Sequence, residues 1–187
     1  CRCLRVFPRI ERFFLALACT AIVQDLCMSS IYIRFTCATL PTDKYRWSAI
    51  AVEYLKALLE AKFHVRALSA NGMIEFGTDK VWDTVSRAFL TEIPTGDFIN
   101  IVCGETGALE HLWVKGVFNV AITGTWPREI NEQTKAALTR YHYVICPTQG
   151  EAFQIAEFCN RPAAEMSPAE LASGLPHIGL KPATAAR

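Results

Sequence analysis

The sequence predicts an α/β fold: a three-layer, Rossmann-like sandwich on a mostly parallel sheet of five strands, in the order 3-2-1-4-5. Five short runs of β-branched and aromatic residues alternate with segments of helical periodicity, which is typical of a parallel sheet covered on both faces. The length of 187 residues suits one domain. With 51% hydrophobic and 20% charged residues, the chain is too apolar to be disordered. Right-handed crossovers then favour the Rossmann order.

The first half of the pattern is a strand, a helix and a second strand. Residues 31–37 are β-branched and aromatic and predict the first strand. Leu40-Pro41 interrupts this run, and Thr42 or Asp43 can cap the helix that follows. The second strand covers 63–68 and ends before Asn71-Gly72. In the helix between them, apolar residues spaced three and four apart form one face, which comprises Trp47, Ile50, Ala51, Tyr54, Leu55, Leu58 and Leu59.

The second half continues the same alternation. Turn-forming residues separate its elements, among them Pro94-Thr95-Gly96 and Pro147. Helical segments are expected at 79–90, 104–115, 128–140 and 150–159, and strands at 98–103, 117–122 and 143–146.

Both ends of the chain differ in composition from this body, so we expect the Rossmann-like domain to cover residues 30–161. Residues 1–29 place four arginines before the apolar run 13–23, which is the outline of a signal peptide. Glu11 interrupts that outline, and Met28 stands just before the first strand. We therefore expect upstream translation or an appended helix, with a secretory signal as the alternative, and a cytoplasmic location. Residues 162–187 are rich in Ala, Pro and Gly and predict a weakly ordered tail or a truncated linker.

Charge and motif content narrow the classes of function. Nineteen basic and 18 acidic residues leave a net charge of +1, which does not favour a nucleic-acid partner. No apolar run approaches the roughly 20 residues of a membrane-spanning helix. The chain lacks G-x-G-x-x-G after the first strand, G-x-x-x-x-G-K-[S/T], and the clustered carboxylates of a phosphoreceiver. NAD enzymes, P-loop enzymes and receiver domains are therefore not expected.

The eight cysteines show no metal-binding pattern, because none of them forms a C-x-x-C pair. Cys37, Cys103 and Cys146 fall at the ends of predicted strands, and Cys159 lies near a helix end. We expect free thiols in a reduced protein core and no metal site.

On a parallel sheet, ligands bind beyond the carboxyl ends of the strands, so the strand-end loops are the candidate site. Gly104-Glu105-Thr106-Gly107 either presents backbone amides to an anion at a helix start or forms a tight strand-to-helix turn. Trp126-Pro127-Arg128 either offers an aromatic platform and a cation to a sugar or phosphate, or is an N1 proline beside a packed tryptophan. Both pairs of interpretations stay open at this stage.

Two stretches give the sequence a family resemblance. In the first, 45–66, Trp47 and Tyr54 precede Ala57-Leu58 and a strand with Val65-Arg66. The second is 119–127, followed by Leu138, Tyr141 and Tyr143-Val144-Ile145-Cys146-Pro147-Thr148. Together they resemble the N-terminal domain of retaining, glycogen-synthase-like GT-B glycosyltransferases, whose last strand there has the form Y-D-x-V-I-V-P-S. At those positions this chain has His142 for Asp, Cys146 for Val and Thr148 for Ser.

The resemblance, over residues 30–160, implies an acceptor-binding half of a sugar transferase. A nucleotide sugar would then be the donor substrate, held mostly by a second domain or subunit, with no Asp-x-Asp metal site. Asp43 or Glu105 would bond acceptor hydroxyls, Trp126 would stack on a sugar face, and Arg128 would meet a phosphate. The residues implied to line the acceptor cleft are Thr42, Asp43, Lys44, Gly104, Glu105, Thr125, Trp126 and Arg128.

Two other classes of function stay open. The first is a non-enzymatic Rossmann-like module that binds a partner or assembles into a larger particle. The second is a small hydrolase or base-excising enzyme in which Glu105 or Glu151 acts.

Overall fold

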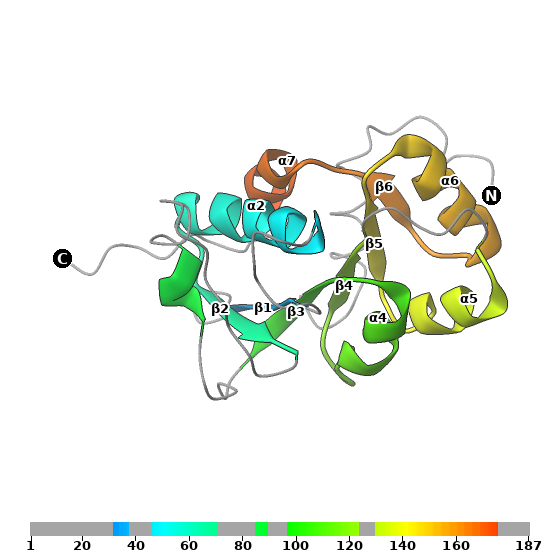
Figure 1. Cartoon of the computed structure of the whole chain (residues 1–187), viewed down its shortest axis with the longest axis horizontal. Helices are drawn as coiled ribbons and strands as arrows, with labels where there is room; N and C mark the ends of the chain where they lie inside the picture. The colour runs from blue at the N-terminus through cyan, green and yellow to red at the C-terminus, as the bar shows by residue number, and fades with distance from the viewer. Residues whose placement is uncertain (1–31, 38–45, 71–84, 90–96, 124–129, 176–187) are drawn as a thin grey trace.

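A single parallel sheet organises the protein (Figure 1). The computed structural model describes residues 32–37, 46–70, 85–89, 97–123 and 130–175, and the fold is given for these. Within them the sheet has six strands in the order β2-β1-β3-β4-β5-β6, all of them parallel. The strands are β1 (Tyr32–Cys37), β2 (Val65–Ser69), β3 (Phe98–Cys103), β4 (Asn119–Ile122), β5 (Tyr143–Cys146) and β6 (Ala163–Glu165). The predicted α/β class and parallel sheet are confirmed.

The predicted strand number and order are wrong in detail. The third long strand, β3, pairs with β1 along its whole length, from Tyr32↔Phe98 to Cys37↔Cys103. On the free edge of β2, Ala67 forms an isolated parallel bridge with Phe89. The chain therefore visits the outer edge of β2 before it returns to the centre as β3. Phe89 thus occupies the place that a third strand has in the Rossmann order. Of the helix expected at 79–90, residues 79–84 and 90 lie outside the described residues; the 3-10 turn η2 (Ser86–Ala88) ends before Phe89, whose backbone is extended.

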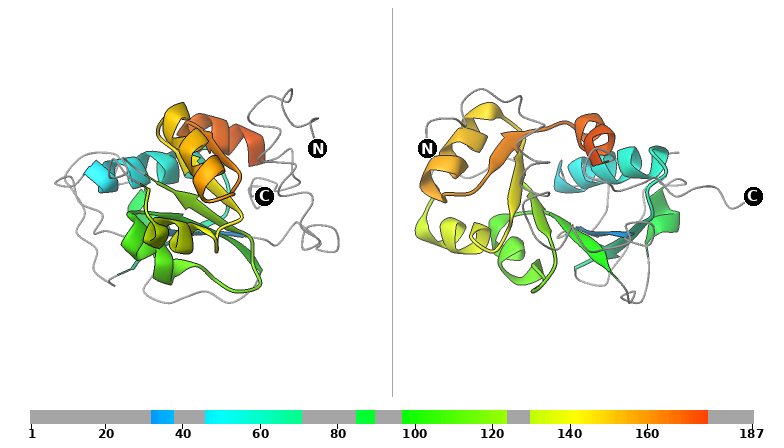
Figure 2. Two further views of the ribbon diagram at one scale, coloured as in Figure 1. Left: turned by 90° about the vertical axis from the view of Figure 1, so that its right-hand side faces the viewer. Right: turned by 180° about the vertical axis from the view of Figure 1, so that it is seen from behind.

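Helices cover both faces of the sheet and make it the middle layer of three (Figures 1 and 2). One face packs against α2 (Arg46–Glu60) and α7 (Pro168–Gly174), which lie side by side. The other face packs against α4 (Thr106–Leu112), α5 (Glu132–Leu138) and α6 (Gln149–Phe158). The lateral order of the strands explains this division. From β1 to β2 the chain steps across the sheet in one direction, and from β3 through β4 and β5 to β6 it steps in the opposite direction. Right-handed crossovers in opposite directions place their helices on opposite faces.

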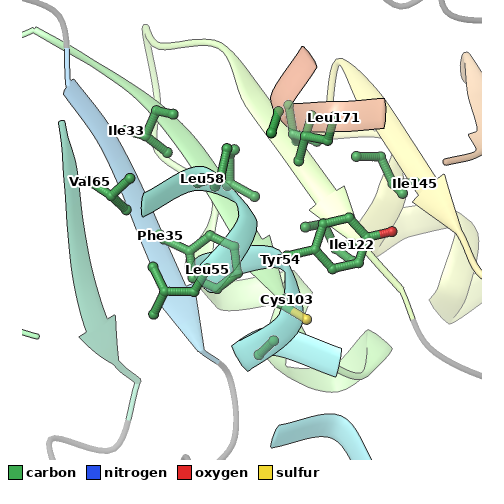
Figure 3. Close-up of a cluster of buried hydrophobic side chains, with 14 of the residues drawn as sticks. Ile33, Phe35, Tyr54, Leu55, Leu58, Val65, Cys103, Ile122, Ile145 and Leu171 are labelled. Atoms are coloured by element: carbon green, nitrogen blue, oxygen red, sulfur yellow. The ribbon is translucent and has the colours of Figure 1, made fainter. Parts of the chain in front are cut away.

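The largest core lies under α2 (Figure 3). Alternate residues of β1, Ile33 and Phe35, point to this face because successive side chains of a strand point to opposite sides. From α2, Leu55 and Leu58 project onto them and are fully buried. Of the face that the three-and-four spacing predicts, Ala51, Tyr54, Leu55 and Leu58 are buried, Ile50 and Leu59 are partly buried, and the side chain of Trp47 lies outside the described residues. Within the part of the chain that the structure describes, no helix has the length and apolar character to cross a membrane.

Residues 163–175 were expected to be a weakly ordered tail, and they instead complete the domain. β6 pairs with β5 from Val144↔Ala163 to Cys146↔Glu165. Ser167 and Glu170 then form a capping box, with Glu170 Oε2 2.7 Å from the Ser167 amide and Ser167 Oγ 3.3 Å from the Glu170 amide. Leu171 of α7 is fully buried in the core under α2. The Ala- and Pro-rich composition, which predicted a tail, thus belongs in part to the short capped helix α7.

Replacing Leu55 with alanine should lower the free energy of unfolding by about 2–5 kcal/mol, because it leaves a cavity in the main core. The matched control is Lys56→Ala, one residue away and exposed, which removes only a surface pair with Glu60 at 3.6 Å and should cost about 0.5 kcal/mol or less. Urea denaturation measures both. Equal effects of the two substitutions would contradict this packing of α2.

A second substitution tests whether α7 belongs to the domain. Leu171→Ala should cost about 2–5 kcal/mol in the same urea experiment, since its side chain is wholly inside the shared core. Ser173→Ala, on the exposed side of the same helix, should cost about 0.5 kcal/mol or less. A Leu171→Ala protein as stable as the unsubstituted chain would show that α7 does not contribute to the fold.

Candidate functional site

All six strands are parallel, so their carboxyl ends meet along one edge of the sheet, which is where ligands bind on such folds. The eight residues predicted for the site lie in loops that follow β1, β3 and β4. Gly104 and Glu105 are among the described residues. Thr42, Asp43, Lys44, Thr125, Trp126 and Arg128 lie outside them.

The segment from Gly104 to Gly107 is a tight strand-to-helix turn. Gly104 is buried, and its amide donates to the carbonyl of Ile122, 3.1 Å away, which continues the pairing of β3 with β4. Glu105 is exposed and precedes α4, where its carbonyl accepts from the amides of Ala108 and Leu109. These contacts favour the turn over the anion cradle, because the Gly104 amide already has a partner and α4 has only seven residues.

A cavity of about 330 Å³ opens farther along the same edge, beyond the ends of β4, β5 and β6. Each of these strands contributes a residue at its carboxyl end: Thr123, Pro147 and Glu165. The helices α2 and α7, adjacent in both views of Figure 2, close the remaining sides. The lining residues that come from α2, α7 and the β6–α7 connection are Ile50, Glu53, Tyr54, Met166, Ser167, Pro168 and Glu170.

Hydrogen bonds hold the walls of this cavity in place. The Tyr54 hydroxyl of α2 donates to the carbonyl of Met166 and so ties the helix to the β6–α7 connection. Thr123 is buried, and its hydroxyl donates to the carbonyl of Ile145 at 3.0 Å. Burial raises the pKa of Tyr54, and the negative charges around it, including Glu170 and Glu53, raise this pKa further. The phenol therefore stays protonated and remains a hydrogen-bond donor at neutral pH.

The lining combines hydrogen-bonding and apolar groups, as small-molecule pockets generally do. Glu53, Glu165 and Glu170 bring carboxylates, while Thr123 and Ser167 bring hydroxyls. Side chains of Ile50, Met166, Pro147 and Pro168 supply apolar surface. The arrangement can accept hydrogen bonds from a ligand and pack against its carbon skeleton. Of the residues that the structure describes, no group of three or more His, Cys, Asp or Glu side chains could hold a metal ion.

Neither Gly104 nor Glu105, the two described residues among those predicted for the site, is part of this cavity lining. The strand-end rule pointed to the loops after β4 and β5, which supply Thr123 and Pro147. The rule does not reach Glu165, Ser167 and Glu170, because the sequence predicts a weakly ordered tail or linker at 162–187. A signal was present there: Ser167-Pro168-Ala169-Glu170 is the pattern of a capped helix start, with proline at the first helical position.

The four described cysteines are free and buried, as the sequence predicted. Burial raises the pKa of Cys37 to about 12. Burial also raises the pKa of Cys146 to about 12, although a hydrogen bond with Thr123 opposes the shift. Because the thiolate is the reactive form, we expect these thiols to react slowly in the folded protein.

Comparison with known proteins identified no relative: no family model, no curated protein and no solved structure matches this chain.

The four buried thiols should resist a thiol reagent until the protein unfolds. In a variant with serine at positions 1, 3, 19 and 27, reaction with 5,5′-dithiobis(2-nitrobenzoate) at pH 8 should be on the order of a hundredfold slower in buffer than in 8 M urea, since burial disfavours the thiolate and blocks access. Absorbance of the released thiolate reports the rate. Reaction in buffer as fast as in urea would contradict the burial of these side chains.

Proposed function

We propose that this chain binds a sugar or glycoside as the acceptor-binding half of a GT-B-type glycosyltransferase. The observation that carries the proposal is the cavity beyond β4, β5 and β6, with its carboxylates, hydroxyls and apolar surface. The position at the carboxyl edge of a parallel, Rossmann-like sheet supports it too, because that edge is where such folds bind their ligands.

The chemistry of the lining suits a polyhydroxylated ligand. Sugar hydroxyls donate hydrogen bonds, and a carboxylate accepts them more strongly than a neutral group does. Glu53 of α2 and Glu165 of β6 line the same cavity, and we propose that one ligand bonds to both. The C–H faces of a sugar ring are apolar and can pack against Ile50 and Met166.

The charge of the cavity lining favours an uncharged sugar acceptor over a phosphate-bearing donor. Among the described residues of the lining there are three carboxylates and no lysine or arginine. A carboxylate-lined cavity repels the phosphates of a nucleotide sugar. The donor would therefore be held by a second domain or subunit, and transfer of its hexosyl group would release the nucleoside diphosphate there.

The experiment is a saccharide titration of the full chain. Saturation-transfer NMR with methyl α-glucoside, methyl α-mannoside and N-acetylglucosamine identifies a binder, and calorimetry measures its Kd. Glu53→Gln should weaken binding about tenfold or more, since it replaces a charge-assisted hydrogen bond with a neutral one. Glucose 1-phosphate should bind less tightly than methyl α-glucoside, because its phosphate meets the same carboxylates.

Glu60→Gln is the matched control, because Glu60 is on the same helix, is exposed and is absent from the cavity lining. Its Kd should equal that of the unsubstituted chain. A double variant, Asp43→Ala with Trp126→Ala, tests the part of the cleft that the sequence predicted and should also weaken binding. Failure of all three saccharides to bind would contradict the proposal, as would equal Kd values for Glu53→Gln and Glu60→Gln.

A further inference from the structure

A buried polar cluster lies at the opposite, amino-terminal edge of the sheet, and Asn119 is its centre. Asn119 begins β4 and is fully buried. Its side-chain amide donates to the carbonyls of Val114 and Val117, at 2.7 and 2.9 Å. Its side-chain oxygen accepts from the amide of Val114 and from the side chain of Asn100. Asn119 therefore holds the α4–β4 loop, residues 113–118, against the end of the sheet.

His142 holds the backbone of the same residue. Its amide donates to the carbonyl of Asn119 at 2.9 Å, and its ring atom Nδ1 accepts from the amide of Asn119 at 3.0 Å. The imidazole also stacks on Phe118, with ring centroids 4.8 Å apart and planes inclined by 22°. One half-buried histidine thus contacts two consecutive residues, at the point where the loop becomes β4.

We propose that His142 is an acid-sensitive latch, which holds the end of the 113–118 loop while its Nδ1 is unprotonated and releases it when Nδ1 takes up a proton. An imidazole nitrogen that accepts a hydrogen bond cannot carry a proton. In the imidazolium both nitrogens carry hydrogen, so Nδ1–H and the Asn119 N–H point at each other. The amide then loses its partner, and an unpaired amide at a buried position is costly.

The surroundings of His142 set the direction of the switch. Burial lowers the pKa of His142, and the positive charge of Arg161, just before β6, lowers it further; the contact with the Asn119 backbone opposes this shift in pKa but is the smallest of the three effects. From the preceding turn, Arg140 adds a cation over the Trp113 ring, and Tyr141 is a buried phenol whose raised pKa keeps it neutral. At the start of β4, His142 contacts Asn119 and Phe118, and both of these side chains are uncharged. The latch is thus closed at pH values above the 6.5 of a solvated imidazole, and it opens as the pH falls below that value towards the lowered pKa.

Two contacts limit what is released. Arg140 donates to the carbonyl of Glu110 at 3.1 Å, and its guanidinium lies 5.1 Å from the centre of the Trp113 ring. The Arg140 guanidinium stays protonated near pH 6, so these contacts persist and the start of the loop stays attached. The cluster also contains a buried acceptor without a partner, the side-chain oxygen of Asn100. Loss of the Asn119 amide bond would add a second unpaired polar atom to this buried network, at a further cost in free energy.

Amide NMR of the full, ¹⁵N-labelled chain between pH 7.5 and 5.0 tests the latch. The Asn119 amide proton should shift upfield along the titration curve of the His142 ring, with a midpoint below 6.5. Its protection against hydrogen exchange, corrected for the intrinsic rate at each pH, should fall at least about tenfold. The Val114 amide, bonded to the side chain of Asn119, should follow the same curve.

Two variants separate the latch from general acid effects. His142→Phe keeps an aromatic ring against Phe118 but has no titratable nitrogen, so the Asn119 and Val114 shifts should become independent of pH. The control is His64→Gln, since His64 also has a lowered pKa but is exposed and contacts Tyr32 instead of this loop. In that variant the Asn119 titration should be unchanged.

The proposal is overturned if the His142 ring titrates while the Asn119 amide stays constant, or if the ring does not titrate above pH 5. It also fails if the Asn119 curve persists in His142→Phe or disappears in His64→Gln. The first two outcomes are read from the unsubstituted chain and therefore do not depend on the folding of a variant.

Discussion

The parallel pairing of β1 with β3 is the constraint on which the rest of this structure depends. Six consecutive residues of each strand are in register, from Tyr32 opposite Phe98 to Cys37 opposite Cys103. Two parallel strands cannot be joined by a hairpin, so every connection has to cross a face of the sheet. Right-handed crossovers on the two sides of this pair place α2 on one face and α4, α5 and α6 on the other. They also bring all carboxyl ends to one edge, which creates the location of the candidate site.

The two ends of the sheet have different physical roles. At the carboxyl end, side chains project into a cavity, and the Tyr54 hydroxyl joins α2 to the β6–α7 connection. At the amino end, polar side chains bond to one another and to the backbone, with Asn119 at their centre. Polar side chains at the carboxyl end thus line a cavity, and those at the amino end hold a loop.

The proposed acceptor function and the cavity chemistry are linked through charge. Glutamates of α2, β6 and α7 line one cavity, although Glu53 lies more than 100 residues before Glu165 and Glu170 in the chain. They suit hydroxyl donors and oppose phosphates, which fits a division of labour between an acceptor half and a donor half. Residues 163–175 contribute two of the three glutamates of this lining.

The sequence by itself determined the α/β class, five of the six strands and the buried face of α2, because these depend on local periodicity. Alternating β-branched runs encode strands, and a spacing of three and four encodes a helix face wherever they occur. The burial of the strand-end cysteines followed from the same pattern. Tertiary structure alone decided that β3 pairs with β1, that Phe89 lies on the outer edge of β2, and that residues 163–175 join the sheet and core. It also decided that Glu53, Glu165 and Glu170 line the same cavity. Those contacts join residues far apart in the chain, and their free energy comes from packing and pairing that no local window of sequence contains.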